Sequence, residues 1–272
     1  LVVKSPAPEY PADFSGGFIL VNTKDVPSSN LFTISVGTSL NDQTHFKKFL
    51  YNKGSGTDFL GFDNGFRSLK GGINAVLSPM NNGYDLLNNG LNNDWTVKDR
   101  RPLADLSLNM NFSRRWVDSS GRTLAILGTV NYSNSYRTYL DMDNNLFGAY
   151  DMTHDCSNYL RKSIDDQYNH SVRIGTMLNF TYIPASGNSR YEFKNIFNQL
   201  GKDRYTYRKG TDAQSDYEES AEYYYQSRTT YNGQFTGKHT LGDADKLDWS
   251  TGYSYANRNM PDRRRYTTVL NE

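Results

Sequence analysis

Residues 106–113 read Leu-Ser-Leu-Asn-Met-Asn-Phe-Ser, and their strict alternation decides how the rest of the chain is interpreted. Apolar side chains stand at the even positions and uncharged polar side chains at the odd ones. Because side chains of a β-strand point to opposite faces with period 2, the stretch predicts a strand with one apolar and one polar face. A half-buried soluble sheet gives this alternation, and so does a transmembrane β-barrel with lipid outside and a polar lumen inside.

The same alternation recurs on both sides of this stretch. A second clear copy runs from 31 to 40, and a short β-branched strand is expected at 18–24. Further strands are predicted at 124–140, 172–182, 191–208, 223–235 and 247–255. The pattern is absent from 41–102, which is rich in Gly, Asn and Asp, so we expect a long loop there. A short helix is expected inside that loop around 44–51.

The expected connections alternate in length. Longer loops are expected at 41–102, 141–169 and 210–221, and tight turns at 117–122, 184–189 and 242–245. Antiparallel outer-membrane barrels have this asymmetry, with short turns at one end of the strands and longer loops at the other. The predicted fold class is therefore all-β, an antiparallel transmembrane β-barrel, and it is favoured over a soluble β-rich protein.

Aromatic side chains gather near both ends of the predicted strands, as expected for belts at the two membrane interfaces. Those beside the tight turns are Phe112, Trp116, Tyr182, Tyr191, Phe235 and Trp249. Those toward the longer loops are Tyr132, Tyr136, Tyr225, Tyr253 and Tyr255.

Composition restricts the other classes of protein. The chain is 36% hydrophobic with a mean hydropathy of −0.74, and no apolar run approaches the roughly 18–20 residues of a membrane-spanning helix. A formal net charge of +1 gives no support for a general polyanion-binding role, so no nucleic-acid partner is expected. Cys156 is the single cysteine, which excludes an internal disulfide.

Two segments resemble the TonB-dependent outer-membrane receptors. Residues 10–27, Tyr-Pro-Ala-Asp-Phe-Ser-Gly-Gly-Phe-Ile-Leu-Val-Asn-Thr-Lys-Asp-Val-Pro, resemble the end of the plug domain, where a Gly-Gly step precedes a hydrophobic strand ending in Thr-Lys. Residues 58–67, Asp-Phe-Leu-Gly-Phe-Asp-Asn-Gly-Phe-Arg, resemble a loop motif common in the Bacteroidetes branch. That motif usually continues Asp-Gly-Thr-Arg, so Asn64 and Phe66 depart from it. The match is somewhat better to these receptors than to the SusC-like nutrient importers.

The resemblance implies a plugged barrel of about 22 strands, and the chain is too short for one. We therefore expect a fragment, with residues 1–28 as the C-terminal remnant of the plug and 29–272 as the first part of the barrel. About seven barrel strands are expected, with a long extracellular loop at about 41–102. The implied location is the bacterial outer membrane, and the implied function is import of a scarce extracellular solute with energy from the TonB complex, which acts on plug parts not contained here. Outer-membrane lipid is a further expected partner, and a surface lipoprotein is a candidate one.

The two faces of the strands give candidate residues. Lumen-facing candidates, which would contact the plug or a passing solute, are Ser107, Asn109, Asn111, Arg173, Lys194, Gln226 and Arg228. Lipid-facing candidates are Leu106, Leu108, Met110, Phe112, Ile126, Val130, Ile174, Phe180 and Trp249. Candidates for an outward-facing ligand site are Asp58, Phe59, Phe62, Arg67, Tyr136, Arg137, Tyr139, Arg204 and Tyr207.

No pattern for covalent chemistry is found in the sequence. His154-Asp-Cys156 lacks partners at the spacing of a zinc site, and 141–145 lacks the Gly and the closing Glu of a calcium loop. Adjacent carboxylates such as Asp165 and Asp166 point apart on a strand, so they do not form a glycosidase pair. We expect no enzyme, cofactor or metal. The alternatives are a non-transporting barrel or adhesin that binds through its loops, and a soluble β-rich carbohydrate-binding module or enzyme.

Overall fold

The computed structural model describes residues 2–3, 18–19, 26–68, 92–212, 214, 216–242 and 245–270. This part of the chain is all-β, as expected, with one turn of 3-10 helix, η1 (Asp58–Leu60). The short strands are β1 (Val2–Val3), β2 (Phe18–Ile19), β4 (Phe49–Tyr51), β5 (Lys98–Arg100) and β8 (Leu146–Asp151). The longer strands are β3 (Leu31–Ser39), β6 (Asp105–Val117), β7 (Thr123–Asp143), β9 (Cys156–Ile183), β10 (Ser189–Asp212), β11 (Tyr217–Leu241) and β12 (Asp245–Leu270).

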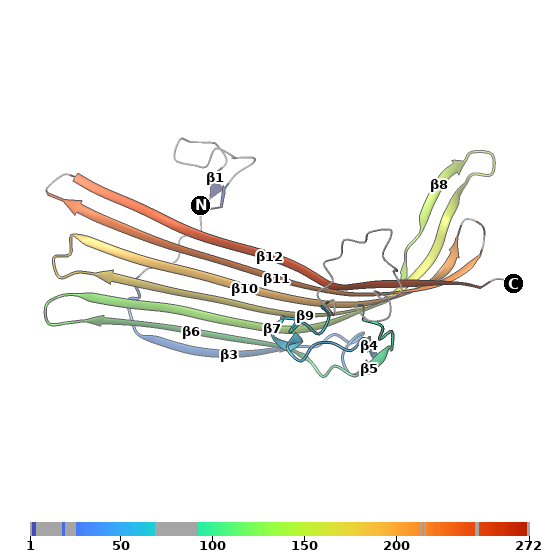
Figure 1. Ribbon diagram of the computed structural model, residues 1–272, viewed down its shortest axis with the longest axis horizontal. Coiled ribbons are helices and arrows are strands. Elements are labelled where there is room, and N and C mark those ends of the chain that lie inside the picture. The colour runs from blue at the N-terminus through green and yellow to red at the C-terminus, as the bar shows by residue number, and fades with distance from the viewer. Residues whose placement is uncertain are drawn as a thin grey trace, which may run out of the picture.

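One large antiparallel sheet dominates the structure (Figure 1). Its strand order is β12-β11-β10-β9-β7-β6-β3, so neighbours in space follow one another along the chain, and β8 pairs with β9 to form an arm beyond the sheet. Within the described residues the sheet is open, with β3 and β12 at its edges. The β1–β2 and β4–β5 pairs form separate two-stranded sheets. The expected stretch 20–24 lies outside the described residues.

The strands run much further from the tight turns than the alternation indicated. Strand β9 has 28 residues and β10 has 24, which at about 3.3 Å per residue is roughly 80–90 Å. The predicted loops at 141–169 and 210–221 are therefore wrong, because β8, β9, β10 and β11 occupy most of both. In these extensions charged, Tyr and Thr side chains occur on both faces, so the ladder continues without the apolar signal that marks a half-buried strand.

The predicted helix around 44–51 is also wrong. A turn is followed there by β4, which pairs with β5. Phe49 at the start of β4 is only 1% exposed and lies edge-on to the rings of Tyr136 and Tyr168. Burial of this aromatic side chain against the large sheet holds the segment as a strand.

Register divides the side chains of the large sheet between two faces. One cross-strand row on a single face contains Ser107, Ser133, Arg173, Leu200 and Arg228, and every second residue along each strand shares that face. In β12 a register shift opposite Tyr225–Ser227 changes the residues on this face from even-numbered ones, up to Arg258, to odd-numbered ones, from Arg263. We call this the polar face and the opposite one the apolar face. Residues 41–68 and 92–104 pack on the apolar face far from the tight turns, and we call them the cover (Figure 1). No helix in the described part of the chain is long and apolar enough to cross a membrane.

Candidate functional site

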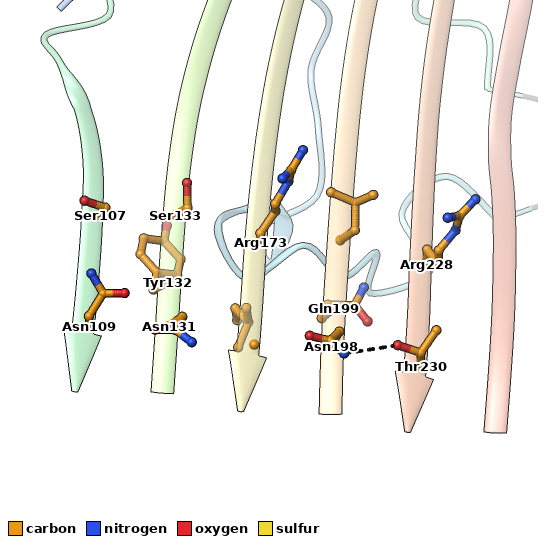
Figure 2. A pocket seen from close by; sticks show the side chains of 13 residues that line it. Ser107, Asn109, Asn131, Tyr132, Ser133, Arg173, Asn198, Gln199, Arg228 and Thr230 are labelled. Carbon is orange, nitrogen blue, oxygen red and sulfur yellow. Dashed lines mark hydrogen bonds between the residues drawn. The ribbon is translucent and has the colours of Figure 1, made fainter. Parts of the chain in front are cut away.

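The polar face carries a groove of about 480 Å³ across β6, β7, β9, β10 and β11. Figure 2 shows Ser107, Asn109, Asn131, Arg173 and Arg228 on its surface, with Asn198 donating a hydrogen bond to Thr230. All seven lumen-facing candidates lie on this face by register: Ser107, Asn109, Asn111, Arg173, Lys194, Gln226 and Arg228. This arrangement offers a polar, hydrogen-bonding wall.

Cations are concentrated on the half of the polar face that begins at this groove and continues away from the tight turns. Arg228 lies directly opposite Arg258 in the β11–β12 ladder, and Arg173 lies in the same cross-strand row, separated from Arg228 by Leu200. All three arginines are exposed. Arg258 donates a hydrogen bond to the Gln226 Oε1 over 3.1 Å. The row therefore presents three guanidinium groups to the same space.

Three carboxylates partly neutralise this half of the face. Arg208 donates two hydrogen bonds, of 2.6 and 2.8 Å, to the two carboxylate oxygens of Asp165 in a bidentate geometry. Glu222 accepts from Arg204 over 3.2 Å and from Arg263 over 2.9 Å. The third carboxylate, Asp105, pairs with Arg137. Hydrogen bonding and charge from Arg208 outweigh the effect of desolvation, so the pKa of Asp165 lies below its ordinary value.

The apolar face carries all nine lipid-facing candidates: Leu106, Leu108, Met110, Phe112, Ile126, Val130, Ile174, Phe180 and Trp249. Beside the tight turns this face is uncovered, and Leu108, Val130 and Phe235 each expose more than a third of their surface. The uncovered apolar band on β10 runs from Tyr191 to Phe197, and the next residue on this face, Gln199, is buried under the cover. It ends where Gly61 of the cover contacts the backbone of Gly201.

The cover fills the rest of the apolar face. Phe49, Tyr168, Tyr205 and Tyr223 form its buried core with Ala221. Gln199 donates a hydrogen bond to the carbonyl oxygen of Gly61, and Tyr223 donates one of 2.7 Å to the carbonyl oxygen of Trp95. The tyrosines Tyr136 and Tyr225, expected in an exposed belt, are instead covered, because the cover packs its own aromatic rings and guanidinium groups against this part of the sheet.

The 58–67 motif forms a closed ion-pair cluster rather than an open binding loop. Arg67 is 5% exposed and donates to both oxygens of Asp58 over 2.7 and 2.6 Å, and to Asp63 over 2.8 Å. Its guanidinium carbon lies 3.8 Å from the ring centroid of Tyr225. Burial alone would lower the pKa of Arg67, but the hydrogen bonds to Asp58 more than offset it. The motif therefore fastens the cover to β11.

Two titratable groups lie under the cover on neighbouring strands. His170 and Asp203 are cross-strand partners in the β9–β10 ladder. Burial lowers the pKa of His170 to about 3, so its ring is neutral, and it stacks on Tyr136 with centroids 4.4 Å apart. Burial raises the pKa of Asp203 to about 6, although the charge of Arg67 opposes that shift.

The nine ligand-site candidates are not brought together. Asp58 and Arg67 form an ion pair with each other and so do not present their charges to a ligand. Phe59 and Phe62 are exposed on the cover. Tyr136 and Tyr207 lie on the apolar face, whereas Arg137, Tyr139 and Arg204 lie on the polar face. The sheet thus separates them.

Sequence reasoning missed the contacts that cap the edge of β7. Strand β6 begins at Asp105, and beyond this point β7 would present open backbone donors. Asp105 accepts a hydrogen bond of 2.9 Å from the Tyr136 backbone and contacts His45 at 3.0 Å, and Thr44 accepts one of 2.9 Å from the Thr138 backbone. No local pattern indicates this pairing, because Thr44 and Thr138 are 94 residues apart.

Metal ligation and similarity to known proteins add no further assignment. Among the described residues no group of three His, Cys, Asp or Glu side chains could hold a metal ion, and His154 contacts Asp151 at 2.7 Å while Cys156 is exposed. No family model, curated protein or solved structure matches the chain. The class that the geometry defines is an all-β protein built on a large antiparallel sheet.

Proposed function

We propose that the chain is part of the transmembrane β-barrel of a TonB-dependent outer-membrane receptor, which binds a scarce extracellular solute and imports it. The observation that carries this proposal is the uncovered apolar band beside the tight turns. It spans Tyr191 to Phe197 on β10 and Leu106 to Trp116 on β6, and a membrane-spanning strand needs about 9–11 residues. Water-exposed proteins rarely leave a continuous apolar surface of this kind open.

The opposite face of the same strands supports the proposal. Behind the apolar band most side chains are Ser, Asn, Thr and Arg, with Glu192, Lys194 and Ile196 beside them on β10, and this largely polar surface suits a water-filled lumen or contact with a plug. A sheet with lipid on one side and water on the other needs no second layer of protein over its apolar face. The open edges at β3 and β12 are the places where further strands would pair to close the barrel.

The resemblance of residues 10–27 to the end of a plug domain supplies the energy-coupled part of the proposal. In that family TonB acts on the plug, and the barrel carries no covalent chemistry. The bacterial outer membrane is then the location, with lipid around the apolar band and the solute on the polar side.

Solute depletion by intact cells tests this function. A strain expressing the full-length protein and a strain lacking its gene are grown in the same limiting medium, and the solutes remaining outside are profiled. We expect at least one solute to be consumed only when the protein is present, and a protonophore to abolish the difference. Equal depletion by both strains, or consumption that the protonophore leaves intact, would contradict energy-coupled import.

One observation favours a second function, binding through loops without transport. The arm of β8 and the first part of β9 projects beyond the sheet, and Phe147, Tyr150 and Met152 on it are 54%, 55% and 88% exposed (Figure 1). Replacing residues 146–160 by a short Gly-Ser linker distinguishes the two functions. A receptor should keep energy-dependent uptake without the arm, whereas an adhesin should lose attachment and show no uptake in either form.

A further inference from the structure

The net charge of the whole chain conceals a strongly basic region on the polar face. Between the cross-strand row of Arg173 and that of Arg208, the cations are Arg137, Arg173, Lys202, Arg204, Arg208, Arg228, Arg258, Arg263 and Arg265. The carboxylates on the same region are Asp105, Asp165 and Glu222. The formal net charge of the chain is only +1, so the excess of positive charge is confined to this face and balanced elsewhere.

Five of these cations have no carboxylate partner in the part of the chain that the structure describes: Arg173, Lys202, Arg228, Arg258 and Arg265. The four arginines among them are exposed. With strands about 4.8 Å apart and about 3.3 Å per residue, the five span roughly 15 by 20 Å, the size of a small solute.

The arrangement of the five is unfavourable without a counter-charge. Arg228 and Arg258 are directly opposite in the ladder, and like charges in that position destabilise a sheet. Arg265 lines a smaller polar cavity of about 230 Å³ with Arg208, Glu222 and Arg263. Guanidinium groups bind carboxylate and phosphate oxygens in a planar, bidentate geometry, which gives them a preference for such anions over neutral solutes.

We infer that this basic region binds a small solute carrying several carboxylate or phosphate groups. The inference rests on the proposed function in taking the polar face as the wall of the solute path, and it names the chemical class of the imported solute. Arg173, Arg228 and Arg258 hold the anionic groups. Arg265 and Lys202 extend the site toward the ends of the strands that lie away from the tight turns.

Calorimetric titration of the purified full-length protein with citrate tests the inference, with the neutral trisaccharide maltotriose as the comparison. We expect citrate to bind at low ionic strength, to bind more weakly in 0.5 M NaCl because salt screens exposed charges, and maltotriose not to bind. Arg228→Gln should weaken citrate binding about tenfold, and the triple variant Arg173→Gln, Arg228→Gln, Arg258→Gln should abolish it. Lys209→Gln removes an exposed cation from the other face of β10 and should change nothing.

Two results overturn the inference. One is no citrate binding by the full-length protein, as expected if an acidic segment of the same protein covers the arginines. The other is binding that the triple variant retains. Recovery of the triple variant in the outer-membrane fraction is measured in parallel and reports on the proposed function alone. If the full-length protein is recovered in the outer membrane but does not bind citrate, the proposed solute class is wrong and the proposed receptor function is not contradicted.

Discussion

The two ends of the apolar face differ in what covers them. Beside the tight turns, Leu108 and Phe235 stand exposed with nothing packed over them among the described residues. At the other end the same face carries Tyr168, Tyr205 and Tyr223, and the cover buries them. Aliphatic and Phe side chains need no polar partners and can face lipid, whereas buried tyrosines require protein groups for their hydroxyls. One face thus has an uncovered apolar part and a covered aromatic part, and the change between them occurs near Gly201.

Breaking the ion pair that fastens the cover should have the largest effect. Arg67→Ala leaves the partly buried carboxylates of Asp58 and Asp63 without their cation, which costs about 3 kcal/mol of local stability. Hydrogen exchange of residues 53–68 should accelerate. The matched control is Arg122→Ala, which breaks an exposed pair with Asp118 at a tight turn and should leave stability nearly unchanged, because solvent screens that pair. Similar effects of the two variants would show that the motif does not fasten the cover.

A charge placed on the uncovered end should have the next largest effect. Leu108→Arg puts a cation into the proposed lipid band and should cost about 2–4 kcal/mol in a folding titration in lipid vesicles. Asn109→Arg puts the same cation on the polar face one residue away and should be nearly neutral. Equal stability of the two variants would contradict the proposal that Leu108 faces lipid and Asn109 faces water.

The position where the apolar band ends can be tested through a close backbone approach. A Cβ added at Gly201 would lie 2.5 Å from the Gly61 Cα, so Gly201→Ala must displace the cover, at about 1–3 kcal/mol. Gly187→Ala at a tight turn meets no atom within 4 Å and should cost only about 1 kcal/mol, because its φ of 70° is strained for alanine. Proteolysis within 41–68 should increase for the first variant alone.

The smallest expected effect is a pH dependence confined to the covered end. The folded-state pKa of His170, about 3, lies below its ordinary value, so its contribution to stability is lost as pH falls below about 6.5. The folded-state pKa of Asp203, about 6, lies above its ordinary value, so its contribution is lost as pH rises from about 4 to 6. The two contributions oppose each other between pH 4 and 6.

Single variants separate these contributions, each of which changes the free energy of unfolding by at most about 1.4 kcal/mol per pH unit. His170→Gln should make unfolding less sensitive to acidification than it is in the unmodified protein. Asp203→Asn should make it more sensitive. Urea titrations between pH 4 and 7 measure both slopes, and a shift of both in the same direction would show that these groups do not titrate as described.

The sequence predicted the uncovered end well and the covered end poorly. Near the turns, each strand alternates between apolar side chains on one face and polar ones on the other, so period 2 is visible in stretches such as 106–113 and 172–182. Further along, Asp203 and His170 on the covered face are as polar as Lys202 and Ser171 on the other. The alternation disappears there although the hydrogen-bonded ladder continues.

For the candidate sites too, the sequence predicted what depends on local alternation and missed what depends on contacts between distant segments. Strand parity placed Arg173 and Arg228 on one face, because parity depends only on local sequence. The pairing of Arg67 with Tyr225 depends on how the cover folds back over β11, and contacts across such a separation leave no periodic signal. The row of Arg173, Arg228 and Arg258 likewise required the register of three strands.

Spin-label accessibility along residues 106–113 reports directly whether the apolar side chains of β6 face lipid. In full-length protein carrying Cys156→Ser and reconstituted in lipid vesicles, a nitroxide is placed at each position in turn. Its collision rates are measured with oxygen, which partitions into lipid, and with a water-soluble nickel chelate. We expect oxygen maxima at 106, 108, 110 and 112 and nickel maxima at 107, 109 and 111. Nickel accessibility at the even positions equal to that at the odd ones would contradict a lipid-facing apolar band.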